Sequence, residues 1–131
     1  MRFADTSYWI ALQVTRDRNH VAAAALWRHD QHPVRTSTAV LGETWTWLRR
    51  RAGHMAAVRA VNDIRDSARV SVALVDESVD VRAWEWLHRR DERAYSYVDA
   101  TSFEIMRRER ITEALAFDGD FSAAGFIEVR P

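Results

Sequence analysis

Short apolar segments that suit β-strands alternate with longer segments of helical periodicity along the whole chain. No Asn-Gly or similar signal for a tight hairpin separates any two of the strand-like segments. Because strands that are joined through helices run in the same direction, the alternation predicts an α/β fold. We expect a central parallel sheet of four to five strands between layers of helices.

The predicted elements follow the apolar pattern and the helix breakers. Strands are expected at residues 1–5, 34–37, 70–75, 114–117 and 126–129. Helices are expected at residues 7–14, 19–30, 41–52, 54–66 and 79–87, and from Ser96 onward. The segment 70–75 (VSVALV) is apolar and β-branched on both faces, so we expect helices to cover both of its faces.

The length of 131 residues and an apolar share of 47% allow one sizeable core. We therefore expect a single domain over residues 1–131. No segment is apolar for the roughly 18 residues that a membrane span needs, and the first residues, MRFADTS, contain no apolar signal region. A cytoplasmic protein without a membrane partner is expected. The absence of cysteine excludes disulfides and thiolate zinc sites.

All 19 basic residues are arginine, and lysine is absent. Two classes of phosphoryl-transfer domain share the size and βα pattern of this chain, the response-regulator receivers and the haloacid-dehalogenase-type phosphatases. Both require a lysine beside their aspartates, so both are excluded. The formal net charge is zero, so a nucleic-acid partner would have to meet a local basic face.

Carboxylates stand where the expected strands end and where two expected helices begin. The five acids are Asp5, Glu43, Asp99, Asp118 and Asp120. Asp5 and Asp118 stand at the ends of expected strands, and Asp120 lies two residues beyond Asp118. Glu43 lies one turn into the helix after the second strand, and Asp99 lies in the first turn of the helix that Ser96 opens. Open parallel sheets bind their ligands beyond the carboxyl ends of the strands. We therefore expect the five side chains to gather at one edge of the sheet.

Each acid alone also has a structural interpretation. Asp5 could cap the helix that follows it, and Asp99 completes a capping box with Ser96. Asp118 and Asp120 could be turn residues around Gly119, and the remaining acid could be a solvated helix residue. A cluster of four or five such groups is different, because their mutual repulsion raises their pKa values unless a cation lies among them.

A hard divalent cation is the natural partner of such a cluster. Carboxylates and waters suit Mg²⁺ or Mn²⁺, which prefer octahedral oxygen coordination. An ion held in this way activates a water and neutralises charge on a phosphodiester, and a second ion about 4 Å away could stabilise the leaving oxygen. The sequence therefore predicts a metal-dependent hydrolase of phosphodiesters.

The ordered acidic motifs of the chain resemble those of PIN-domain ribonuclease toxins of the VapC type, from VapBC toxin–antitoxin systems. The matching segments are Asp5-Thr6-Ser7, Glu43, Tyr97-Val98-Asp99-Ala100, the run ALAFDGDF at 114–121, and Gly125-Phe126. The resemblance runs from Asp5 to the end of the chain. Each motif alone is weak evidence, but their order and spacing are fairly specific.

The resemblance implies a PIN-like α/β/α sandwich, an Mg²⁺ or Mn²⁺ site and endonucleolytic cleavage of structured RNA, either tRNA or rRNA. By position, it implies that the catalytic and metal-binding acids are Asp5, Glu43, Asp99 and Asp118. It makes Asp120 an accessory acid near a second metal, and Thr6 or Ser7 a helper that orients a ligand or water. Many relatives have threonine at the position of Ala116, which removes a hydroxyl near the site but no ligand. The resemblance also implies a VapB-type antitoxin and a homodimer.

Two other functions fit the same residues. One is a PIN-like binding module without catalysis, although intact acids at all four main positions speak against it. The other is a metal-dependent DNA nuclease, which the same chemistry would permit. RNA and DNA substrates tested with Mn²⁺ distinguish the three.

The remaining conspicuous residues have structural interpretations. We expect the five histidines to lie at the surface, and the arginines at 49–51 and at 107, 108 and 110 to complement helix dipoles, with some reaching RNA phosphates. The chain has six tryptophans. Trp45 and Trp47 lie two apart on one expected helix, as do Trp84 and Trp86, so one of each pair can enter the core while the other is left for a partner.

Overall fold

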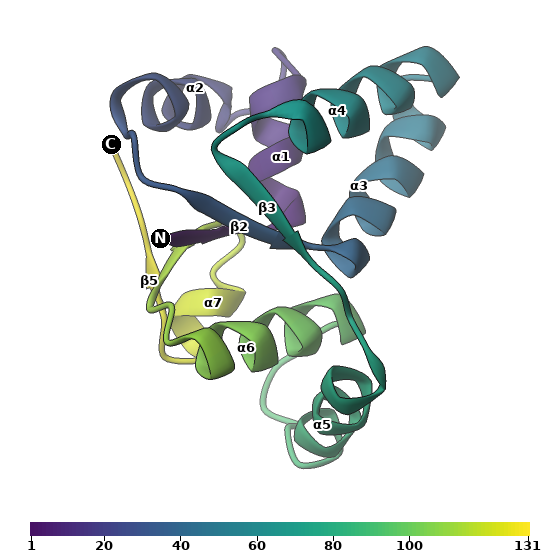
Figure 1. The fold of residues 1–131 in the computed structure, drawn as a ribbon, viewed down its shortest axis with the longest axis vertical. Coiled ribbons are helices and arrows are strands. Elements are labelled where there is room, and N and C mark those ends of the chain that lie inside the picture. Colours follow the sequence, from purple (N-terminus) through teal and green to yellow (C-terminus); the bar gives the residue numbers. More distant parts are fainter.

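The computed structural model describes all residues from Met1 to Pro131 and contains one sheet of five parallel strands in the order β3-β2-β1-β4-β5. The strands are β1 (Arg2–Ala4), β2 (Val34–Ser37), β3 (Val70–Ala73), β4 (Glu113–Leu115) and β5 (Ile127–Glu128). The helices are α1 (Thr6–Gln13), α2 (His20–His29), α3 (Thr38–Arg51), α4 (His54–Asp66), α5 (Glu77–His88), α6 (Tyr97–Glu109) and α7 (Asp120–Ala123). Figure 1 shows α1 to α4 on one side of the sheet and α6 and α7 on the other, with α5 outermost.

The predicted α/β/α sandwich with a parallel sheet is confirmed. All five predicted strands and all six predicted helices are present, and only the one-turn helix α7 was not expected. None of the helices is long and apolar enough to cross a bilayer.

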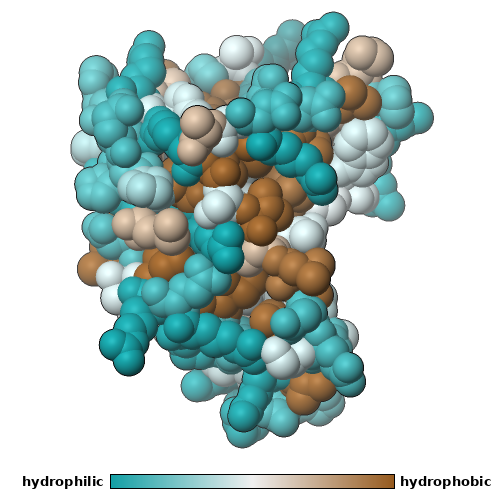
Figure 2. Space-filling model, viewed as in Figure 1, coloured by the Kyte–Doolittle hydropathy of each residue, from teal (hydrophilic) through white to brown (hydrophobic).

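The expectation that residues 70–75 are covered on both faces is wrong. β3 is an edge strand that pairs only with β2. Only Ala73 of this strand is buried, Ser71 is exposed, and Leu74 directly after the strand is 70% exposed. Figure 2 shows hydrophobic side chains gathered over the middle of the face where β3 lies. An apolar sequence on both faces therefore does not require helices on both faces.

Aromatic packing in the core fixes α6 against the sheet and α7. The rings of Phe103 on α6 and Phe121 on α7 meet edge to face with centroids 4.9 Å apart, and Phe3 of β1 stacks on Phe121 at 6.4 Å. All three rings are fully buried. This packing holds the start of α6 close to the ends of β1 and β4.

The carboxyl ends of the three central strands lie at one edge of the sheet. Asp5 follows β1, and its backbone N–H donates to the carbonyl of Leu115 on β4 at 3.0 Å. Ser37 ends β2 and caps α3 by accepting from the N–H of Val40 at 3.1 Å. Buried hydrogen bonds join β2 to β1 and to α1 here, since Thr36 Oγ1 donates to the carbonyl of Ala4 at 2.9 Å and accepts from Trp9 Nε1 at 3.2 Å.

Candidate active site

Asp5 is the N-cap of α1, and its carboxylate is almost fully buried. Asp5 Oδ2 accepts hydrogen bonds from the N–H of Ser7 at 3.1 Å and from Ser7 Oγ at 2.7 Å. Ser7 Oγ also accepts from the N–H of Phe117 at 3.1 Å, so this hydroxyl connects the end of β4 with Asp5. Burial, followed by the charge of Asp118, raises the pKa of Asp5 to about 8.

Asp99 forms the predicted capping box at the start of α6. Its Oδ2 accepts from the N–H of Ser96 at 2.9 Å, while Ser96 Oγ accepts from the N–H of Asp99 at 3.0 Å. The residue is buried, and burial is the main reason that its pKa rises to about 6, with further contributions from Asp120 and Asp118. The structural and the functional interpretation of this acid are therefore compatible, because one carboxylate oxygen caps the helix and the other is left for a ligand.

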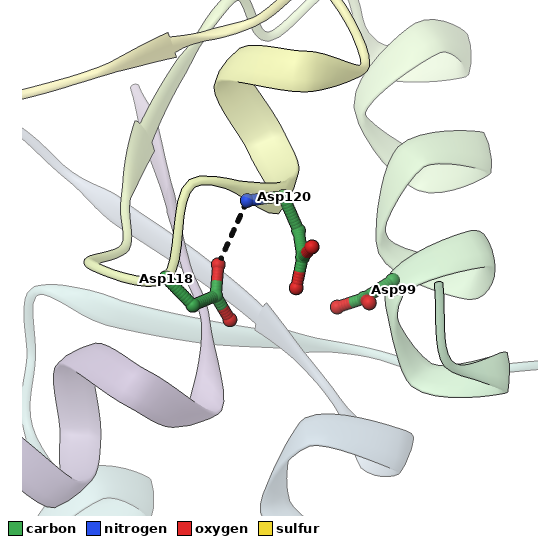
Figure 3. Close-up of side chains that lie close together, drawn as sticks. All are labelled: Asp99, Asp118 and Asp120. Atoms are coloured by element: carbon green, nitrogen blue, oxygen red, sulfur yellow. Dashed lines mark hydrogen bonds between the residues drawn. The ribbon is translucent and has the colours of Figure 1, made fainter. Parts of the chain in front are cut away.

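Asp118 lies on the turn between β4 and α7, Asp120 is the first residue of α7, and both side chains point toward Asp99 (Figure 3). One carboxylate oxygen from each of the three aspartates lies within 4.8 Å of the others. The N–H of Asp120 donates to Asp118 Oδ1 at 3.1 Å, and Gly119 between them has a φ of 83°, which favours glycine. Asp118 is exposed as a residue, but partial burial of its carboxyl group and the nearby charges of Asp120 and Glu128 raise its pKa.

All seven predicted site residues line one cleft of about 370 Å³. They are Asp5, Thr6, Ser7, Glu43, Asp99, Asp118 and Asp120. The three acids whose carboxylate oxygens lie within 4.8 Å of one another are Asp99, Asp118 and Asp120, so Asp120, which was expected to be an accessory acid, belongs to this group. Glu43 lines the same cleft from α3. The Oγ1 atom of Thr6 is buried without a hydrogen-bond partner. Crowded carboxylates with raised pKa values beside an unpaired hydroxyl suit a hard divalent cation and its waters.

Two functional residues were not found from the sequence. Arg93 Nε donates to Asp120 Oδ1 at 2.6 Å and its Nη2 donates to the carbonyl of Asp118 at 3.1 Å, so this guanidinium offsets part of the negative charge of the turn. Glu128 on β5 accepts from the N–H of Gly119 at 3.3 Å and of Ser122 at 2.9 Å. Its side chain is 3% exposed and fixes the turn that carries the two aspartates.

A sequence model of the family described as PIN domain matches residues 2–127. The chain belongs to the PIN-domain family. It is 56% identical over 131 residues to the 23S rRNA-specific endonuclease VapC20 of Mycobacterium tuberculosis, strains CDC 1551 and H37Rv, covering 100% of this chain and 99% of the relative. The crystal structure of Mycobacterium tuberculosis VapC20, described as a sarcin-ricin loop cleaving toxin, matches with a TM-score of 0.95 and 55% identity over 100% of both chains.

The resemblance to VapC-type PIN toxins that the sequence motifs suggested is therefore confirmed. PIN nucleases depend on divalent metal, and the acidic cleft of this PIN domain has the oxygen donors that such an ion requires. None of the five histidines lines the cleft, which agrees with a site built from oxygen ligands.

The crowded acids predict an unusual pH dependence of the metal-free PIN domain. The pKa of Asp5 rises from 3.8 to about 8 on folding, and that of Asp99 rises to about 6. At a pH between the unfolded pKa of 3.8 and the raised pKa in the folded state, each of these acids keeps a proton in the folded state that it has released in the unfolded state. The free energy of unfolding therefore falls as pH rises through this range. Urea unfolding in EDTA between pH 5 and pH 8 should show this decline, and Asp5→Asn should reduce its slope. A flat profile of the wild type would contradict the crowding of the acids.

Proposed function

We propose that this chain is the toxin of a type II toxin–antitoxin pair and acts as a metal-dependent endoribonuclease. The observation that carries the proposal is the gathering of all the motif acids in one cleft of a fold that superimposes on VapC20 over its full length. The substrate class is structured ribosomal RNA, with the sarcin-ricin loop of 23S rRNA as the first candidate. The support for this choice is the 56% identity to a 23S rRNA-specific endonuclease and the match to a structure described as that of a sarcin-ricin loop cleaving toxin.

The residues of the cleft divide the work between ligands and positioning groups. Asp5, Glu43, Asp99 and Asp118 would hold Mg²⁺ or Mn²⁺, and Asp120, whose carboxylate lies within 4.8 Å of those of Asp99 and Asp118, would serve as an accessory acid. When bound, the metal supplies activation of an attacking water and neutralisation of charge on the phosphodiester. Ser7 keeps the Asp5 carboxylate oriented through its 2.7 Å hydrogen bond. The unpaired hydroxyl of Thr6 is available to orient a water or a ligand.

Cleavage of a defined hairpin tests the proposal. The purified protein is incubated with an RNA hairpin of the sarcin-ricin loop sequence, with a tRNA and with DNA of the hairpin sequence, each in Mn²⁺ and in EDTA. We expect one cut in the loop of the ribosomal hairpin in Mn²⁺ only. Cleavage of the DNA alone would indicate a DNA nuclease, and intact substrates throughout would indicate a binding module without catalysis.

The toxin assignment includes an antitoxin of the VapB type as partner. The support for this partner is the similarity of the chain to VapC20. Co-expression with the product of a neighbouring small gene should restore growth and give a stable complex on gel filtration. Toxicity that persists with every such product would argue against the toxin–antitoxin assignment.

A homodimer is also part of the proposal. The hydrophobic surface of Figure 2 lies over β3, and Leu74 directly after this strand is 70% exposed. On α5, which follows along the chain, Val81 and Trp84 are each 47% exposed. Such a surface is favourable to bury against a second copy. Light scattering at micromolar concentration should give twice the 15.2 kDa of one chain, and Trp84→Glu should shift the mass toward the monomer. A monomeric mass for the wild type would contradict the dimer.

A further inference from the structure

A second cavity of about 260 Å³ lies directly beside the acidic cleft. The two cavities share four lining residues, Ser7, Ile10, Trp47 and Asp118. The second one continues past Phe117 to Arg18 and Asn19 in the loop between α1 and α2. A ligand that reaches the acids can therefore extend into it without leaving the protein surface.

Trp47 forms the wall that both cavities share. It lies on α3, one turn after Glu43, and is half-buried. The guanidinium of Arg51, one further turn along the helix, lies 5.0 Å from the centroid of the Trp47 ring. A cation above an indole ring is attracted to it and favours this arrangement. The structure therefore provides an aromatic group at the border of the acidic cleft.

The far end of the second cavity contains a cation that the cleft lacks, because Arg18 lines it together with Asp17, whose Oδ1 accepts from the N–H of Asn19 at 2.8 Å. Arg18 is exposed there and forms no ion pair with any carboxylate of the chain. The half-buried ring of Phe117 adds a second aromatic group, with Arg130 at 4.8 Å from its centroid. Aromatic rings with an unpaired arginine are the chemistry that recognises an unstacked nucleotide, by stacking on its base and pairing with its phosphate.

We propose that this second cavity is a nucleotide subsite, in which the Trp47 ring stacks on the base of a nucleotide that flanks the scissile phosphate and Arg18 pairs with the next phosphate. The proposal rests on the ribonuclease function argued above and adds a specificity-determining residue to it. A loop with splayed bases fills such a subsite, whereas a stacked duplex does not. Trp47 thus selects RNA in which one base beside the cut is already free.

Trp47 could instead be only the edge of the small hydrophobic cluster of Leu48, Ala57 and Ala60, against which it also packs. Trp47→Leu and Trp47→Phe separate the two roles, because both keep an apolar side chain there but only phenylalanine keeps a ring. Trp27→Leu is the matched control. Trp27 is also half-buried under an arginine, with Arg69 at 4.2 Å, but it lines a cavity that contains none of the motif acids.

The test combines these variants with a series of hairpin RNAs in which one loop base at a time is replaced by an abasic residue. Binding is measured by fluorescence anisotropy with Mn²⁺ in proteins that also carry Asp99→Asn, so that the RNA stays intact. Cleavage is measured in proteins that retain Asp99. Stacking on one base contributes about 5- to 100-fold in affinity. We expect Trp47→Leu to weaken binding and to lower kcat/KM by about tenfold, with Trp47→Phe close to wild type and Trp27→Leu unchanged.

The decisive result is the coupling between protein and RNA. One abasic position should weaken binding to the wild-type ring by about tenfold and have no effect on Trp47→Leu, because both changes remove the same stack. If each abasic position weakens RNA binding equally in the protein with Trp47 and in Trp47→Leu, the subsite proposal is overturned. A Trp47→Leu variant that binds and cleaves RNA like wild type would also overturn it. If the wild type cleaves no RNA at all, the proposed function itself has failed. The Mn²⁺-induced rise in melting temperature should be the same in Trp47→Leu and wild type.

Discussion

Asp99→Asn is expected to abolish growth inhibition by this chain and to lower the rate of RNA cleavage by about a hundred- to a thousandfold. Asp99 is buried at the cleft and lies within 4.8 Å of the carboxylate oxygens of Asp118 and Asp120. The substitution removes one negative ligand from a cluster that has to hold a divalent ion. An amide oxygen can still accept the hydrogen bond from the N–H of Ser96, so the capping box and the fold should persist.

Expression in a bacterial host and cleavage of the ribosomal hairpin measure the two effects. Asp76→Asn is the matched control, because Asp76 also caps a helix through its carboxylate but lies outside the acidic cleft. This variant should stay toxic and active. Equal toxicity of the wild type and Asp99→Asn, with circular dichroism showing both folded, would remove the nuclease explanation of toxicity.

Mn²⁺ is expected to raise the melting temperature of the wild type by several degrees, and Asp5→Asn is expected to raise the metal-free melting temperature while reducing the Mn²⁺ shift. A ligand that binds only the folded state contributes roughly 2.7 kcal/mol at a hundredfold excess over its Kd, which corresponds to several degrees for a domain of this size. The buried Asp5 carboxylate is unfavourable when ionised, because burial and Asp118 raise its pKa to about 8. Neutralising it relieves this cost and deletes a ligand at the same time.

Melting curves recorded with EDTA give the metal-free melting temperature, and curves with millimolar Mn²⁺ give the shift that the metal produces. Asp76→Asn again serves as control, and its expected change in metal-free melting temperature has the opposite sign to that of Asp5→Asn. Hydrogen bonds from Val79 and Ser78 lower the pKa of Asp76, so its ionised form favours the folded state and its neutralisation should lower the metal-free melting temperature. The Mn²⁺ shift of this control should remain that of the wild type. A wild type that does not respond to Mn²⁺ would remove the metal site and, with it, the proposed mechanism.

Local signals in the sequence were sufficient for most of the fold. The bounds of β2 and α4 agree with the prediction, because a proline precedes the strand and a glycine precedes the helix. The capping box at Ser96 is also confirmed. The position of β3 at the sheet edge could not be predicted. Apolar periodicity indicates which side chains are buried, but it does not indicate whether a strand has one neighbouring strand or two. The short helix α7 depends on contacts with β5 that no local pattern contains.

The acids of the cleft could be predicted because each has a place relative to a strand end or a helix start. Arg93 could not, since it reaches Asp120 across 27 positions and any of the 19 arginines could have done so. The tryptophan prediction is confirmed for one pair, with Trp86 buried and Trp84 exposed. In the other pair both rings are half-buried, so Trp45 and Trp47 do not divide into a core and a partner residue as expected. Helical spacing predicts the face of the helix on which a side chain lies, but it does not predict how far neighbouring elements bury that side chain.

The dependence of the acidic turn on Glu128 has a consequence for synthesis on the ribosome. The N–H groups of Gly119 and Ser122 donate to the carboxylate of Glu128 on β5, which follows the acidic turn along the chain. A nascent chain that has not yet released residue 128 carries Asp118 and Asp120 on a turn without this support, and β5 cannot yet pair with β4. The acidic turn is therefore expected to become fixed only after β5 has been translated and has paired with β4, so the cleft should form late in the folding of this domain.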